Sequence, residues 1–255
     1  MPSLAQRRRA QVLAERAAAD AGAPVATGTA APMPESGEAA SQYNLLRAVL
    51  HDNLRSLDGI RSVNDRNPKK IEMAKAFDAW VDGALAAGTE GKAAQDEIVV
   101  TMMIWAIDYR DIDRGLDLAA HAIKHGLALP ERYSRTAATF VADQVAEAWL
   151  ADAKDVTREQ LLRTWTLVGE ADMPDQAKAK LLKALGRATA AAAASFDPQA
   201  DNAPAGGKPA LLSAAQGFFQ SAIKLQKNVG VVKDLEAVDR ELKQLAEAAA
   251  TANQT

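Results

Sequence analysis

Apolar residues recur at helical spacing over most of this chain. In residues 41–60, SQYNLLRAVLHDNLRSLDGI, Ser41 is a suitable N-cap for an amphipathic helix. One stripe of this helix carries Leu46, Leu50, Leu54 and Leu57. A second helix is predicted to start at Pro68, since proline suits the first helical turn. Its apolar side carries Ile71, Ala74, Phe77 and Trp80.

The middle of the chain is more strongly apolar. Nine of the ten residues from Ile98 to Ile107 are apolar, so the helix expected over residues 93–109 should be buried on nearly all sides. Ten residues are about half of the roughly 20 that a membrane-spanning helix needs. Further helices are predicted over residues 113–125, 134–151, 157–170 and 174–196.

Signals for β-structure are missing from the sequence. No stretch of four or more residues alternates β-branched and polar side chains, and no hairpin dipeptide joins two apolar runs. Alanine is abundant and aromatic residues make up 5% of the chain, a composition that favours helices over sheets. The predicted fold class is therefore all-α, a helical bundle or an array of helical hairpins.

Two segments rich in proline and glycine divide the chain. Residues 22–40 contain three prolines and three glycines, and residues 197–209 contain three prolines and two glycines, which is typical of linkers. The predicted domains are a basic, flexible arm and tether (1–40), a helical core for DNA recognition and oligomerisation (41–196), a linker (197–209) and a helical hairpin (210–255). Residues 1–21 could form a short basic helix around RRRAQVLAERAAA, and the arm could reach DNA or be an unstructured terminus.

The predicted C-terminal hairpin carries a regular apolar stripe. Its members follow the a/d spacing of a helix that packs against another helix, and they are Val231, Leu235, Val238, Leu242 and Leu245. The packing partner could be the preceding helix or a second protein, so these five residues are the partner-binding candidates. Small and aromatic residues give the hairpin a tetratricopeptide-like character, although only one copy is present.

Basic residues gather towards the N-terminus. Residues 1–75 hold 11 Lys and Arg against 8 Asp and Glu, whereas the whole chain has a formal net charge of −3. A helix, a short break and a second helix with basic rims could form a helix-turn-helix variant, and the interleaved acids leave an ordinary solvated surface as the alternative. The DNA-binding candidates are Arg7, Arg8, Arg9, Arg47, Arg55, Arg61, Arg66, Lys69 and Lys70.

The turn WAIDYRDIDRG holds the candidates for a catalytic centre. Asp108, Asp111 and Asp113 could bind Mg²⁺ as in a nuclease. However, Asp111 or Asp113 can also be the cap of the following helix, and this interpretation is favoured. Asp117, His121 and His125 further along are spaced as zinc ligands can be. A histidine before the closing Gly126 also suits the helix dipole, and no metal site is predicted.

Other catalytic motifs are missing from the sequence. It contains no cysteine and no GxxxxGK[ST], GxSxG or HExxH motif, so a P-loop, a serine-hydrolase elbow and a zinc-protease site are not expected. The basic N-terminus lacks the apolar core of a secretory signal. These features predict a cytoplasmic protein without a membrane partner.

Three stretches resemble the small terminase subunit of tailed double-stranded DNA phages, of the type found in temperate myophages and prophages. They are DEIVVTMMIWAIDYRDIDRGLDLAAHAIKHGLALPERYSRT, the ADMPD start that leads to AKLLKALGRA, and VGVVKDLEAVDRELKQL. The resemblance covers about residues 43–245, and it consists of packing and turn patterns rather than catalytic signatures.

The resemblance implies a protein of viral genome packaging in the host cytoplasm. Such subunits bind the packaging site on concatemeric DNA, form homo-oligomers and recruit the large terminase subunit, which holds the ATPase and nuclease. Mg²⁺ and ATP are then expected at the large subunit, and no cofactor is expected on this chain. Because such proteins are also called endonuclease subunits, cutting by this chain stays an alternative, as does a helical scaffold without DNA contact.

Overall fold

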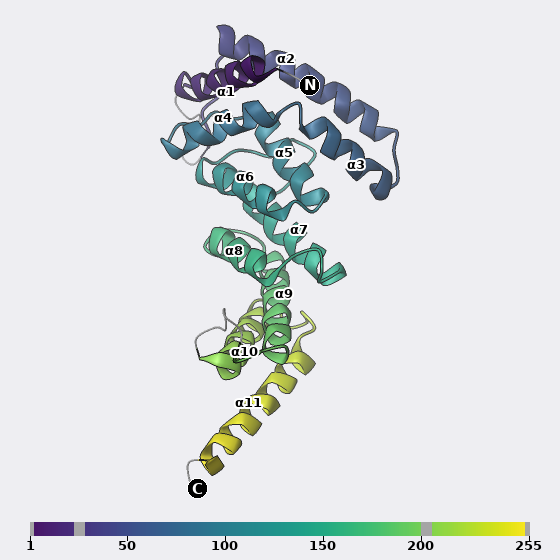
Figure 1. The fold of residues 1–255 in the computed structure, drawn as a ribbon, viewed down its shortest axis with the longest axis vertical. Coiled ribbons are helices and arrows are strands. Elements are labelled where there is room, and N and C mark those ends of the chain that lie inside the picture. Colours follow the sequence, from purple (N-terminus) through teal and green to yellow (C-terminus); the bar gives the residue numbers. More distant parts are fainter. Residues whose placement is uncertain (1–2, 23–28, 200–205, 253–255) are drawn as a thin grey trace. The chain divides into compact units, whose positions relative to one another are not determined.

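A computed structural model of the chain describes residues 3–22, 29–199 and 206–252. Within these ranges the chain forms eleven α-helices and no strand, which confirms the all-α prediction (Figure 1). The chain divides into two compact units, an N-terminal unit (Met1–Ala138) and a C-terminal unit (Thr139–Thr255). These units differ from the domain boundaries predicted at residues 40, 196 and 209. No helix among the described residues is both long and apolar enough to span a membrane.

The N-terminal unit contains six helices. They are α1 (Leu4–Ala19), α2 (Glu38–Asp58), α3 (Val63–Ala74), α4 (Asp78–Thr89), α5 (Glu97–Asp108) and α6 (Ile112–Lys124). As the sequence predicted, α5 is the centre of this unit, and every residue from Ile98 to Ile107 is buried. Asp96 caps α5 by accepting hydrogen bonds from the backbone N–H groups of Ile98 and Val99 and from the Trp80 indole of α4.

The predicted helix from Pro68 through Trp80 is wrong in two respects. It begins earlier, at Val63, where the Ser62 side chain caps the helix. It also breaks before Asp78 and continues as α4. Apolar residues spaced by three drift around a helix with 3.6 residues per turn, so a continuous helix could not aim all of them at the core. The break buries Phe77 and Trp80 completely and leaves Ile71 44% exposed.

Residues 4–19 form a helix, in the part of the arm where the sequence allowed a short basic helix. The structure packs α1 along α4 and against α2 (Figure 1). The helix α1 can pack there because one side of it is a narrow stripe of mostly small side chains. The buried residues of this stripe are Leu13, Ala14, Ala17 and Ala18. Residues 23–28 of the predicted tether lie outside the described residues.

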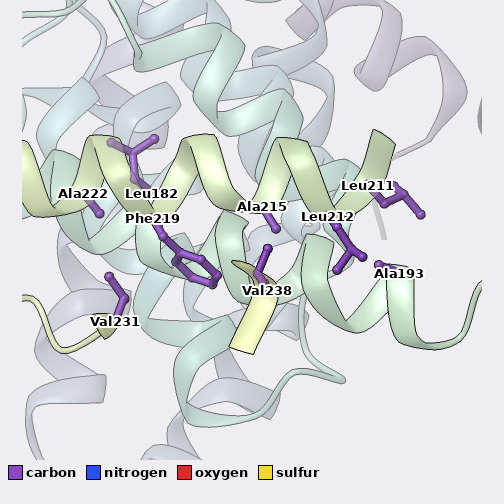
Figure 2. Packing of buried hydrophobic residues seen from close by; sticks show 9 residues of the cluster. All are labelled: Leu182, Ala193, Leu211, Leu212, Ala215, Phe219, Ala222, Val231 and Val238. Carbon is purple, nitrogen blue, oxygen red and sulfur yellow. The ribbon is translucent and has the colours of Figure 1, made fainter. Parts of the chain in front are cut away.

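The C-terminal unit contains α7 (Ala137–Ala151), α8 (Arg158–Val168), α9 (Asp175–Ala194), α10 (Gly207–Leu225) and α11 (Val232–Ala252). Its core is a cluster supplied by α9, α10, α11 and Val231 just before α11 (Figure 2). Phe219 of α10 is completely buried there, and Gly186 of α9 leaves room for its ring. The hairpin of α10 and α11 therefore packs on the rest of its own unit through α9.

Candidate nucleic-acid interface

The two helices from which the sequence suggested a helix-turn-helix variant correspond to α2 and α3, with the break earlier than predicted. The helix α2 ends at Asp58, residues 59–62 form the turn, and α3 begins at Val63. The Ser62 hydroxyl accepts a hydrogen bond from the Asp65 backbone N–H at 3.3 Å. The turn is short because Ser62, its last residue, is the N-cap of α3. The basic residues near the turn therefore lie at one end of the helix pair.

Four predicted DNA-binding residues lie at this turn, and we call them the α2–α3 corner: Arg55, Arg61, Arg66 and Lys69. Arg61 and Lys69 are exposed, and neither pairs with an acidic side chain among the described residues. Arg66 holds the turn in place, since its Nε donates to the Ile60 carbonyl at 3.0 Å. Arg55 is exposed and pairs with Asp52 on α2. The corner therefore presents at least two cations to solvent.

Lys70, the neighbour of Lys69, has a different environment. Its side chain is 10% exposed, and its Nζ lies 2.5 Å from a carboxylate oxygen of Asp108. The side-chain amide of Asn67 donates to the Asp108 backbone carbonyl at 2.9 Å. These contacts join α3 to the end of α5, so Lys70 is occupied inside the N-terminal unit and does not belong to the exposed corner.

Arg47 is likewise engaged in holding helices together. Its Nε donates to Glu97 at 2.9 Å, and the His51 ring contacts the other carboxylate oxygen at 3.0 Å. Burial raises the pKa of Glu97, but the hydrogen bonds from His51 and Arg47 outweigh it and hold the pKa below its usual value. Since Glu97 is the first residue of α5, this cluster fastens α2 to the central helix.

The three candidate arginines of α1, Arg7, Arg8 and Arg9, lie away from the turn, along a groove of about 570 Å³ between α1, α2 and the start of α4. Arg9 pairs with Glu38 at 2.5 Å, and Arg8 donates to Gln11 at 2.9 Å. Arg7 shares the groove with Asp78 and Asp82. These two acids were not predicted from the sequence, although their spacing of four residues places them on one face of α4.

The three candidate catalytic aspartates have separate structural environments. Asp108 pairs with Lys70. Asp111 caps α6 by accepting from the Arg114 backbone N–H at 3.2 Å, and Asp113 lies exposed in the first turn of α6. Within residues 3–22, 29–199 and 206–252, no three Asp, Glu or His side chains are grouped to hold a metal ion. The geometry of this turn is that of a helix start.

The ring of His121 in α6 contacts the ring of His125, the C-cap residue of this helix, with centroids 4.8 Å apart and the ring planes tilted by 51°. His121 is buried against Gly88 of α4, and the ring of His125 lies 3.2 Å from the Gly88 carbonyl oxygen. Burial and the nearby His125 and Lys124 lower the pKa of His121 to about 4. Asp117, one turn earlier, is exposed. Burial and the contact with Gly88 account for both rings as part of the α4–α6 packing.

The candidate partner-binding stripe is divided between the core and the surface. Val231 and Val238 are buried in the cluster of the C-terminal unit, which uses them internally. Leu235, Leu242 and Leu245 are only partly buried against the same cluster. The part of the stripe that a second protein could still contact lies on the C-terminal half of α11.

Comparison with known proteins gives two matches and one absence. Residues 47–176 match a family model described as the phage small terminase subunit. Over 207 residues the chain is 33% identical to the terminase endonuclease subunit of Escherichia phage P2, and the match covers 80% of this chain and 76% of that protein. No solved structure matches the chain. The family match includes the α2–α3 corner, α5 and the aspartate turn.

Proposed function

Since this chain belongs to the phage small terminase subunit family and has a terminase role in genome packaging, we propose that it binds the packaging site on concatemeric phage DNA. In this proposal the α2–α3 corner contacts the DNA, and the C-terminal hairpin recruits the large terminase subunit. The large subunit would supply ATP hydrolysis, with its Mg²⁺. The proposal rests above all on two exposed, unpaired cations, Arg61 just before the N-terminus of α3 and Lys69 in its second turn.

Charge and helix geometry support this choice of face. The N-terminus of an α-helix presents backbone N–H groups and the positive end of the helix dipole, which attract phosphate. Arg61 lies just before this end of α3 and Lys69 lies in the second turn, and Val63, the first helical residue, is 62% exposed. Asn64 is also exposed on this turn and carries the donor and acceptor that read adenine edges. The two cations would position the duplex while Asn64 contacts bases.

A charge-reversal experiment tests the DNA face. The double variant Arg61→Glu, Lys69→Glu should lower affinity for a duplex carrying the packaging site by about tenfold or more. The slope of log K against log salt should also fall by about 2, close to one unit for each lost phosphate contact. The matched control is Lys227→Glu, an exposed lysine in the C-terminal unit. An unchanged salt slope would move the DNA face elsewhere or leave a scaffold without DNA contact.

The name of the phage P2 relative favours a second candidate function, cutting of the DNA by this chain. The residues to test are Asp108, Asp111 and Asp113. Because Asp111 caps α6, alanine there would disturb folding, whereas asparagine is an equally good N-cap without the carboxylate charge. Cleavage with Mg²⁺ or Mn²⁺ that disappears in Asp111→Asn, Asp113→Asn would establish a nuclease. Site-preferring binding without cleavage would leave the cutting to the large subunit.

A further inference from the structure

The docking of α1 on α4 relies on small side chains. The buried residues of α1 are Leu13, Ala14, Ala17 and Ala18, so Leu13 is the only large one. Leu4 is 86% exposed and Val12 is 42% exposed. In contrast, all ten residues from Ile98 to Ile107 of α5 are buried. Since stabilisation by burial grows with the apolar area removed from water, α1 is held far more weakly than the core helix.

One glycine decides how closely α1 approaches. A Cβ atom placed on Gly83 of α4 would lie 2.2 Å from the Gln11 carbonyl oxygen and 2.9 Å from the Ala14 Cβ. The clash is with the α1 backbone, which cannot rotate away as a flexible side chain could. Alanine at position 83 would therefore push α1 off α4, while α4 itself would gain from the higher helix propensity of alanine.

The charges of α1 also face acids within the N-terminal unit. Arg7 lines the groove with Asp78 and Asp82, and it is one of the cations that lower the pKa of Asp78 against the effect of burial and of Asp82. Arg9 pairs with Glu38 at the start of α2, where the two side chains are 68% and 53% exposed. Ion pairs this exposed are weak, and phosphate groups compete for the same arginines.

We propose that α1 is a detachable helix, docked on α4 in the free protein and released when DNA phosphates replace the acids as partners of its arginines. This inference rests on the proposed DNA binding for its trigger. Docked, α1 holds Arg9 against Glu38 of α2 and Arg7 near Asp78 and Asp82 of α4. Released, it adds those cations to the DNA contact. Docking and DNA binding are then antagonistic, and each weakens the other by the same factor.

Energy transfer between two dyes measures the docking directly. The chain contains no cysteine, so cysteines placed at the exposed Val12 of α1 and Thr89 of α4 carry the only labels. Transfer should be high in the free protein and should fall as a duplex saturates it. Without DNA, Gly83→Ala should lower the transfer. Gly217→Ala is the matched control, because a Cβ on that helical glycine meets no atom within 4 Å.

DNA affinity provides the second measurement. Because Gly83→Ala removes the need to undock, it should bind the duplex about three- to tenfold more tightly than wild type. Leu13→Ala, which changes only the largest docking side chain, should act in the same direction and serves if Gly83→Ala does not fold. High transfer in a complex known from anisotropy to be saturated would overturn the inference, and so would weaker binding by a folded variant.

Failure of the two proposals can be told apart. If wild type binds no duplex, the proposed DNA function fails and DNA is not the trigger. The transfer of Gly83→Ala without DNA then decides whether α1 detaches at all. Transfer that stays at the wild-type value in both folded variants, Gly83→Ala and Leu13→Ala, would overturn detachment itself.

Discussion

At the scale of single residues, two adjacent lysines of α3 have different roles, one at the surface and one in the packing of the fold. Lys69 is exposed, whereas Lys70 is buried against Asp108 at 2.5 Å. Lys70→Ala would leave the Asp108 carboxylate partly buried without its partner, and we expect a loss of about 2–3 kcal/mol in the free energy of unfolding. Lys69→Ala should change stability by less than about 0.5 kcal/mol. Urea denaturation of the two variants checks both values.

The outcome also bears on the DNA face. Lys69→Ala should weaken DNA binding while the fold is intact, and Lys70→Ala should reduce binding only through unfolding. If Lys70→Ala stays folded and loses as much DNA affinity as Lys69→Ala, the lysine of the ion pair contacts DNA after all. The sequence could not distinguish these neighbours, because their burial is set by the position of Asp108 on another helix.

His121 makes the stability of the N-terminal unit depend on pH. Its pKa is lowered to about 4 by burial and by the nearby His125 and Lys124, against 6.5 for a free histidine. The unfolded chain therefore binds a proton more readily, so this histidine's contribution to stability is present above pH 6.5 and is lost as the pH falls towards 4. The loss should be about 2–3 kcal/mol.

Asp96 acts in the opposite sense, because burial raises its pKa to about 6 and its carboxylate destabilises the fold as the pH rises through that range. The effect of His121 is therefore measured as the difference in the free energy of unfolding between wild type and His121→Gln. At pH 8 this difference reflects only the packing lost in the variant, because His121 is neutral in both the folded and the unfolded state. The difference should shrink by about 2 kcal/mol between pH 8 and pH 4.5. A difference that is constant across this range would contradict the lowered pKa.

At the scale of helices, two glycines of the C-terminal unit give opposite expectations for the same substitution. A Cβ on Gly186 of α9 would lie 2.4 Å from the buried ring of Phe219, whereas a Cβ on Gly217 of α10 meets nothing within 4 Å. Gly186→Ala should lose about 1–3 kcal/mol through overpacking. Gly217→Ala should gain about 0.5–1 kcal/mol from helix propensity. Denaturation midpoints that move in the same direction would contradict this packing.

The elements that the sequence predicted well are those whose own pattern is strong. The nearly continuous apolar run from Ile98 to Ile107 predicted a buried helix, and the C-terminal stripe predicted a helical hairpin. The break before Asp78 was missed because the residues on both sides of it favour a helix. The helix breaks there only because its apolar residues could not all face the core from one continuous helix. The docking of α1 was missed because alanines give a faint periodicity, and the decisive residue, Gly83, lies about 70 positions further along the chain.

The candidate site was predictable in residue type but only partly in position. The basic N-terminal section was visible as a local excess of Lys and Arg. A cap by Asp111 or Asp113 followed from their place before an apolar helix, and the structure uses Asp111. The pairing of Arg47 with Glu97 and of Lys70 with Asp108 joins residues far apart in the sequence. Such pairs depend on how the helices pack, and no local sequence pattern shows them. They occupy Arg47 and Lys70 and leave the α2–α3 corner as the predicted DNA face.

At the scale of the whole molecule, the proposed function assigns DNA to the N-terminal unit and the large terminase subunit to the C-terminal unit. The two contacts should then be separable by mutation. Leu242→Gln, Leu245→Gln changes the partly buried end of the α11 stripe and should weaken capture of the large subunit by about tenfold or more, since central apolar contacts dominate interface energies. The matched control is Val232→Gln, which changes a 52% exposed residue outside that stripe.

The double leucine variant should keep its DNA affinity within about twofold, because the leucines and the α2–α3 corner belong to different compact units and independent sites have additive effects. The charge-reversed corner, Arg61→Glu with Lys69→Glu, should show the converse and still capture the large subunit. Binding titrations with labelled duplex and with purified large subunit measure both quantities on each variant. If either variant loses both activities while circular dichroism shows it folded, DNA and the large subunit share a surface, and the division of labour between the units is wrong.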